Sequence, residues 1–170
     1  PAVESPTRTI LGAEQKAWLK AGLASSTARW KVLSNQVPFY PFVVGAALPS
    51  VLEQLIDPLD GTIPPLPATL TVEDWNGYRA EQQEMVEVMA AIQNVVVLTG
   101  DYHESFAAEV PQRPGDYRLD GNSVAVEFIC PSITSPGLSE TLEGVGIGPL
   151  SSVINPVFEL NLTLANPDRK

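Results

Sequence analysis

The sequence predicts a layered α/β fold with a mixed sheet, and three observations lead to that class. Segments with apolar residues at a spacing near 3.6 alternate with short apolar runs rich in β-branched residues. The run Val95 to Thr99 is apolar almost throughout, which is typical of buried strands in a sheet covered by helices. Two more runs follow it without a helix between them, so the sheet should be mixed. With 170 residues, the chain should form one domain with one core.

Two helices are expected. The first spans Thr9 to Ala24, and its predicted apolar face consists of Ala17, Trp18 and Ala21, with Leu11 as a further candidate. The second opens in the stretch DWNGYRAEQQEMVEVMAAI, where Asp74 and Asn76 are the candidate caps. Its predicted buried face consists of Met85, Val88, Met89 and Ile92.

Four strands are expected around these helices. The stretch RWKVLSNQV predicts a short buried strand that ends at Ser34 or Asn35. The segment VVVLTGD contains the second strand, SFAAEV the third, and the alternating segment NSVAVEFIC the fourth. Polar residues that directly follow buried strands are the first candidates for a site, because ligands of α/β sheets bind beyond the carboxyl ends of strands.

Residues 38–70 contain seven prolines and predict a long irregular loop, with at most a short helix around Ser50 to Ile56. A loop of this length in a compact domain is usually functional or serves as a lid. A decorative insertion is the alternative, and the sequence leaves both open.

Composition limits the function. The formal net charge is −10 and the ten Lys and Arg residues are scattered, so the chain lacks the basic stripe that nucleic-acid binding needs. An acidic protein that binds an anionic substrate needs metal ions or a locally positive pocket. The single cysteine, Cys130, excludes an internal disulfide and a multi-cysteine zinc site. No apolar run is long enough for a transmembrane segment, and residues 1–10 do not resemble an export signal.

Asp101 and His103, the only histidine, follow the apolar run Val95 to Thr99 in the string VVVLTGDYHESF. A carboxylate and an imidazole two positions apart in a tight turn can bind neighbouring positions of a metal cluster. Gly100 would let the backbone bend closely there. This motif alone favours the alternative, in which Asp101 caps a turn and His103 makes ordinary hydrogen bonds.

Four blocks extend this pattern: RTILGAEQKAWLKAGLASSTARWKVLSNQV, DWNGYRAEQQ, NVVVLTGDYHESFAAEV and VAVEFICPSITSPG. Together they cover roughly residues 8–137, and in this order they resemble the second half of the PhoD-like alkaline phosphatase and phosphodiesterase family. The resemblance implies a metallophosphoesterase-like four-layer αββα sandwich with mixed sheets, of which this chain holds only the second half.

The resemblance also implies metal-dependent hydrolysis of phosphate esters. In that family the G-D-x-H segment supplies metal ligands, so Asp101 and His103 become the expected ligands, and Asn35, at another strand end, the expected catalytic residue. Two or more divalent or trivalent ions are implied, with calcium and iron expected. Carboxylate, amide and imidazole groups are also compatible with zinc, manganese or magnesium.

Some family features are altered or missing. Asn76 stands where the family usually has aspartate, and Gln82 where arginine is common. The motifs G-D-x-x-Y and D-D-H-E, which the family places in an earlier half, do not occur in the chain. We therefore expect residues 1–170 to form the C-terminal part of one metallophosphoesterase-like catalytic domain, inactive alone.

The remaining expectations concern partners and place. The partners would be a phosphate ester substrate and the missing N-terminal half, in the same polypeptide or as a separate chain. A periplasmic or extracellular location follows from the resemblance alone. The rival function is a noncatalytic binding or structural module that retains the fold, and an unrelated α/β domain with a surface Asp101 and His103 pair is a further alternative.

Overall fold

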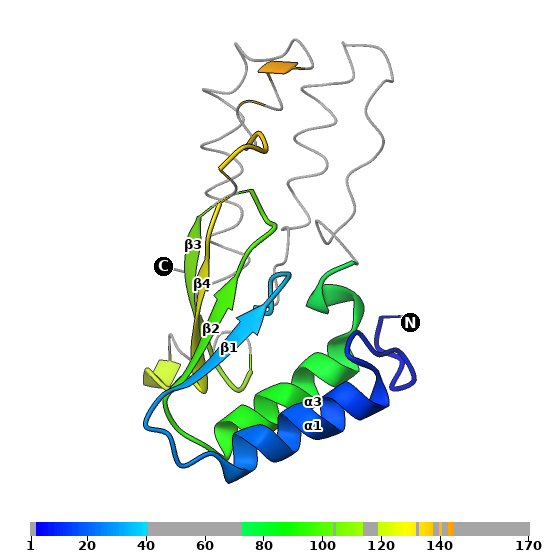
Figure 1. Ribbon diagram of the computed structural model, residues 1–170, viewed down its shortest axis with the longest axis vertical. Coiled ribbons are helices and arrows are strands. Elements are labelled where there is room, and N and C mark those ends of the chain that lie inside the picture. Colours follow the sequence, from blue (N-terminus) through cyan, green and yellow to red (C-terminus); the bar gives the residue numbers. More distant parts are fainter. Residues whose placement is uncertain are drawn as a thin grey trace.

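The computed structural model describes residues 3–40, 73–103, 105–113, 119–131, 133–137, 140 and 143–144. These residues form two helices, a short 3-10 helix and a four-stranded sheet. Figure 1 shows α1 (Gly12–Ser25) and α3 (Arg79–Ala90) side by side along one face of the sheet. The predicted α/β class with a mixed sheet is confirmed.

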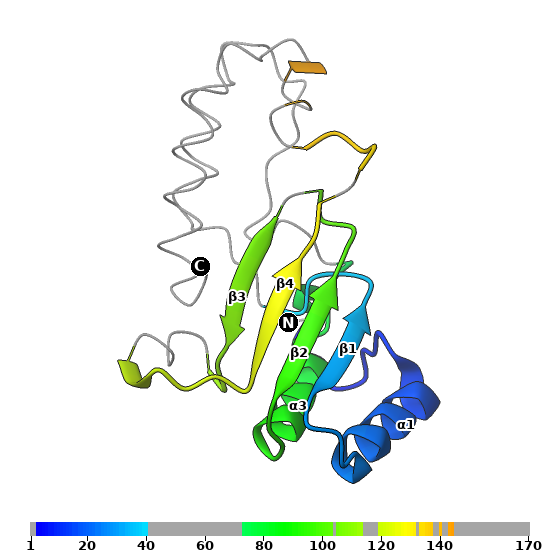
Figure 2. The ribbon, with the colours of Figure 1, turned by 60° about the vertical axis from the view of Figure 1, so that its left-hand side comes forward.

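The sheet has the order β1-β2-β4-β3. Its strands are β1 (Lys31–Asn35), β2 (Val95–Thr99), β3 (Phe106–Val110) and β4 (Ala125–Ile129). Strands β1, β2 and β4 run parallel, while β3 pairs antiparallel with β4. As Figure 2 shows, the three parallel strands therefore end at the same edge of the sheet.

Helix α1 lies close to the predicted range, but most of its predicted apolar face is exposed, and of that face only the further candidate Leu11 packs against the core. Trp18 is 72% exposed, and Ala17 and Ala21 are exposed as well. The helix instead packs through Leu23, which is buried, and Leu19, which is partly buried. These two leucines are four positions apart and share one face, so the aliphatic side chains cover the core and the indole remains outside.

Strand β1 ends at Asn35 as predicted, but it is not a buried strand. Within the described sheet it is an edge strand, and Trp30 and Val32 are 57% and 60% exposed. The apolar content of the segment predicted a strand correctly, whereas its position in the sheet depends on pairing with residues far away in the chain.

The second predicted helix divides into two elements. Residues Trp75–Gly77 form the 3-10 helix η2, whose N-cap Asp74 accepts a hydrogen bond from the backbone amide of Asn76 at 2.8 Å. Helix α3 begins only at Arg79, after Tyr78, which provides no side-chain cap. The predicted cap Asp74 therefore serves the short 3-10 helix and not α3.

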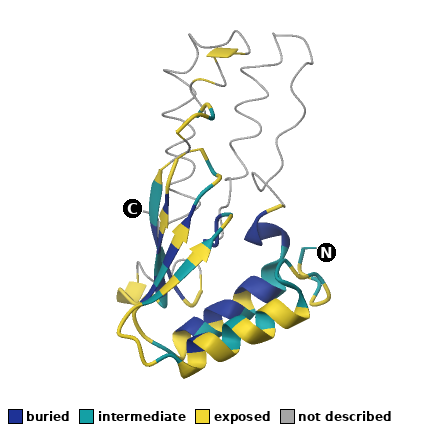
Figure 3. Ribbon diagram, in the orientation of Figure 1, coloured by how far each residue is buried: buried dark blue, intermediate teal, exposed yellow. Residues whose placement is uncertain are grey.

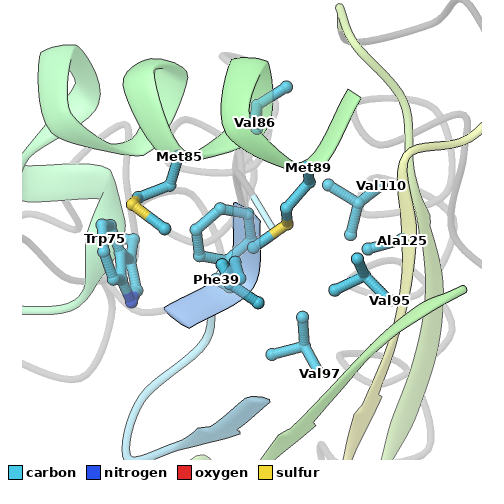
Figure 4. Close-up of a cluster of buried hydrophobic side chains, with 10 residues drawn as sticks. Phe39, Trp75, Met85, Val86, Met89, Val95, Val97, Val110 and Ala125 are labelled. Atoms are coloured by element: carbon cyan, nitrogen blue, oxygen red, sulfur yellow. The ribbon is translucent and has the colours of Figure 1, made fainter. Parts of the chain in front are cut away.

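The core lies between α3 and the sheet, as Figure 4 shows. Met85 and Met89 of α3 are fully buried, and both were predicted to be core residues. They pack with Val97 of β2 and with Phe39, whose ring meets the indole of Trp75 edge to face at a centroid distance of 5.0 Å. Each such fully buried side chain contributes about 1.5–3 kcal/mol through the hydrophobic effect.

The other face of the sheet is apolar but open in the described residues. Along the strands the inward residues are buried, while the outward Leu98 and Phe128 are 46% and 51% exposed, and Val32 lies on the same face. Figure 3 shows exposed and buried stretches following one another along the strands. An apolar outer face of this kind is what a sheet presents when it packs against a further layer.

Two predictions lie outside the described residues. They are the part of the predicted proline-rich loop of residues 38–70 that lies beyond residue 40, and the short helix predicted around Ser50 to Ile56. None of the helices that the structure describes combines the length and the hydropathy needed to cross a bilayer.

Candidate active site

The candidate site lies at the sheet edge where β1, β2 and β4 end. Asn35, Thr99 and Ile129, the last residues of these strands, are aligned by the strand register. The backbone amide of Cys130 donates to the carbonyl of Thr99 at 2.9 Å, so the hydrogen-bonded ladder continues one residue beyond β4. The rigid sheet thereby fixes the point from which the segment containing Asp101 leaves β2.

Asp101 and His103 lie in the turn after β2, and both are exposed. Both have left-handed backbone conformations, with φ values of 65° and 62°. Such residues are uncommon, cost of order 1–3 kcal/mol when strained, and cluster at functional sites. Gly100, which was expected to provide the bend, does not have a positive φ, and a Cβ there would meet no atom within 4 Å. The turn therefore bends at the two predicted ligands themselves.

The Asp101 and His103 side chains make no hydrogen bond or ion pair with another described residue. Among the residues that the structure describes, no three His, Cys, Asp or Glu side chains gather into a metal-binding group. A carboxylate and a neutral imidazole nonetheless suit hard or borderline cations. The donor types fit a metal, and a complete coordination shell would need ligands from outside the described part of the chain.

Asn35 has a fixed amide group. Its Oδ1 accepts a hydrogen bond from the indole Nε1 of Trp75 at 3.3 Å, and its Nδ2 donates to the carbonyl of Val37. A longer contact of 3.5 Å joins Nδ2 to the hydroxyl of Thr99. The structure thus brings Asn35 to the end of β2, and no described contact joins its side chain to Asp101 or His103.

A buried carboxylate lies behind this edge. Glu127, in the middle of β4, has no exposed surface and accepts three hydrogen bonds. The donors are the backbone amides of Phe39 (2.8 Å) and Tyr40 (2.6 Å) and the hydroxyl of Thr99 (2.6 Å). We call Glu127, Thr99 and Asn35, together with these two amides, the Glu127 network.

Burial raises the pKa of Glu127, because a charged carboxylate loses its hydration inside the protein. The hydrogen bonds from Phe39, Thr99 and Tyr40 oppose that rise, and the negative charge of Asp74 adds to it. Asp74 is itself only 3% exposed. Burial thus disfavours the charged form of Glu127, while its three hydrogen-bond donors favour that form.

Asn76 and Gln82, the two departures from the family pattern, are both buried. The Gln82 side chain donates to the carbonyl of Phe39 and so joins α3 to the segment after β1. The Asn76 side-chain atoms Nδ2 and Oδ1 have no hydrogen-bond partner in the described part of the chain. Both amides thus lie at positions that are closed to solvent.

The sequence interpretation missed Glu127 and Thr99. A signal existed for Glu127, because it occupies an inward position in the alternating strand Ala125–Ile129, where an apolar residue is expected. Its donors could not be identified from the sequence, since Phe39 and Tyr40 are 88 and 87 positions away.

Comparisons with known proteins show the family of the chain. The profile of the PhoD-like phosphatase family matches residues 1–161. Alkaline phosphatase D of Bacillus subtilis (strain 168) is 32% identical over 142 residues, which cover 81% of this chain and 21% of that protein. A solved structure of PhoD matches with a TM-score of 0.65 and 26% identity, over 99% of this chain and 26% of that one. The chain spans about a quarter or less of the length of these relatives, and it belongs to the PhoD-like phosphatase family.

Proposed function

We propose that this chain takes part in metal-dependent hydrolysis of phosphate esters, with Asp101 and His103 as metal ligands. The observation that carries the proposal is the turn after β2. Two residues with suitable donor groups hold left-handed backbone conformations at the edge where three parallel strands end. Strained conformations persist where the surrounding structure imposes them, and active sites are the usual place.

Asp101 would provide an anionic oxygen and His103 a neutral nitrogen to the cations. When bound, such ions neutralise substrate charge, lower the pKa of a water molecule and stabilise the charge on the leaving oxygen. Bound cations would offset the negative charge of this chain, which is −10 overall and would otherwise repel a phosphate. Calcium and iron, expected from the resemblance, are our proposed ions.

Asn35 would contact the phosphate ester. Its amide is held by Trp75 and by the carbonyl of Val37, so its orientation is set before a substrate arrives. A polar group that is already oriented loses little entropy when it binds a developing charge. The half-buried position of Asn35 at the shared edge is compatible with this role.

Residues 1–170 would function as the C-terminal part of one metallophosphoesterase-like catalytic domain. Coverage of only 26% of the matched PhoD chain supports this proposal, and so does the exposed apolar sheet face around Leu98 and Phe128. The remaining part would supply further ligands and a second layer over that face. Location in the periplasm or outside the cell stays a prediction from the resemblance.

The experiment is to change Asp101 and His103 to alanine in the full-length enzyme. Each variant should lose activity on a phosphodiester such as bis-p-nitrophenyl phosphate by orders of magnitude and should hold less metal. Unchanged activity and metal content in both would refute the assignment. A native protein that holds no metal and turns over no phosphate ester would instead indicate the noncatalytic module, which the uncharged Asn76 favours.

A further inference from the structure

The buried carboxylate of Glu127 needs a reason beyond packing. It fills an inward position on β4 between Ala125 and Ile129, both of which are buried and apolar. Placing a charge there costs desolvation free energy, and apolar residues of similar size in such positions are often at least as stabilising. Departures of this kind from core patterning are expected mainly at functional sites.

The hydrogen bonds of Glu127 join three segments. Oε1 accepts from the amide of Phe39 and from the hydroxyl of Thr99, and Oε2 accepts from the amide of Tyr40. The carboxylate therefore fastens the chain that leaves β1 to the last residue of β2. Gln82 of α3 binds the carbonyl of Phe39 from the other side, so the same peptide is held from both layers.

Thr99 connects Glu127 to the candidate site in two ways, through its side chain and along the backbone. Its hydroxyl lies 3.5 Å from Nδ2 of Asn35, so the carboxylate, the hydroxyl and the amide form a row across β4, β2 and β1. Along the chain, Thr99 is two residues before Asp101. Fixing Thr99 thus adds a contact to the Asn35 amide, which Trp75 and the Val37 carbonyl also hold, and fixes the start of the turn.

We propose that Glu127 is a positioning residue of the candidate active site, which acts through Thr99 and through the Phe39 and Tyr40 amides to hold Asn35 and the Asp101 turn in place. This inference rests on the proposed function. Glu127 would not touch the substrate or a metal.

The chain contains a matched control for this role. Glu81 is also a buried carboxylate. It accepts hydrogen bonds from the hydroxyl of Thr9 and from the backbone amides of Ile10 and Leu11. It joins α1 to α3 and makes no described contact with Asn35 or Thr99. A purely structural role for Glu127 predicts that Glu127→Gln and Glu81→Gln behave alike.

The experiment compares Glu127→Gln, Glu81→Gln, Thr99→Val and Thr99→Ser in the full-length enzyme. For each variant it measures kcat and KM with bis-p-nitrophenyl phosphate, bound metal, thermal unfolding, and hydrogen exchange of residues 37–40 and 99–103. Replacing a residue that orients metal ligands typically lowers metal affinity or activity by about 10–100-fold. We expect that loss in kcat or metal content for Glu127→Gln, with faster exchange in both segments.

The other variants should separate positioning from stability. Glu81→Gln should lower the unfolding temperature with kcat unchanged. Thr99→Val should reproduce the loss in kcat, and Thr99→Ser should restore it, because serine keeps the hydroxyl. If Glu127→Gln does not fold, the Thr99 pair decides the question.

The inference is overturned if Glu127→Gln keeps the wild-type kcat and metal content, or if Thr99→Val is as active as Thr99→Ser. Wild-type behaviour of Asp101→Ala and His103→Ala would overturn the proposed function and the inference with it. Loss of activity in those two variants with no loss in Glu127→Gln would overturn the inference alone.

Discussion

Replacing Glu81 with alanine should release the start of α1 from α3. Glu81 is 2% exposed, and its carboxylate accepts short hydrogen bonds from the Thr9 hydroxyl (2.7 Å) and the Ile10 amide (2.6 Å). A longer bond of 3.4 Å comes from the Leu11 amide, and Nζ of Lys16 lies 3.5 Å from Oε1. Helix α1 begins at Gly12, whose amide donates to the Thr9 hydroxyl at 2.7 Å, and this hydroxyl in turn donates to Glu81, so Glu81 anchors from α3 the segment that leads into α1.

The magnitude follows from the two short bonds. A hydrogen bond to a charged group contributes about 1.5–3 kcal/mol, so the pair gives about 3–6 kcal/mol. Thr9 is exposed, and water can replace part of what its hydroxyl loses. We therefore expect the lower end, about 3 kcal/mol, in the free energy of opening α1. This corresponds to a roughly 100-fold larger open population.

Native-state hydrogen exchange measures that opening directly, because it reports local unfolding separately from global unfolding. The amides of Gly12–Ser25 should exchange roughly 100-fold faster in Glu81→Ala of the full-length protein than in the unchanged protein. Glu87 is an exposed glutamate on α3, the helix that also carries Glu81, and Glu87→Ala is therefore the control variant. Equal exchange of α1 in both variants would show that Glu81 does not anchor the helix.

Three further predictions concern pH, the core and the isolated chain. Hydrogen bonds from Lys16 and Lys20 lower the pKa of Glu84 below its ordinary value of 4.5. The two ion pairs of Glu84 therefore stabilise the fold above that pH. Their contribution is lost as the pH falls through the lowered pKa that Glu84 has in the folded protein. Because these side chains are partly exposed, Glu84→Gln should remove at most about 1 kcal/mol of pH-dependent unfolding free energy. A variant whose unfolding free energy depends on pH as strongly as that of the unchanged protein would contradict this prediction. Met89→Ala should cost about 2–5 kcal/mol in urea unfolding, since Met89 is fully buried, and a loss below 1 kcal/mol would speak against the described core. The 170-residue chain alone should show no metal-stimulated phosphatase activity, and robust turnover would show that it needs no further part.

The elements could be predicted from sequence because their patterns are local. The β-branched run of β2 and the Met85 and Met89 spacing of α3 determine element type and inward face within a few residues. The prediction for α1 placed Trp18 on the apolar face because its side chain is apolar. Which face of the helix is buried depends on contacts with other elements, which the local sequence does not show. The edge position of β1 was missed for the same reason.

The candidate site could be predicted only in part. The position of Asp101 and His103 after a buried strand follows from the sequence, and the structure places them there. Their left-handed backbone does not, since Gly100 was the residue expected to bend. The bonds of Glu127 to the segment after β1 were also beyond prediction, because they join residues nearly ninety positions apart.

Elemental analysis of the purified full-length protein tests the central claim most directly. The native protein should hold stoichiometric metal, while Asp101→Ala and His103→Ala should each hold less and hydrolyse phosphate esters orders of magnitude more slowly. Asp120→Ala, which removes an exposed carboxylate distant in sequence from the turn, should match the native protein in both measurements. Native metal content and activity in the Asp101 and His103 variants would contradict the assignment of a metal site to the turn after β2.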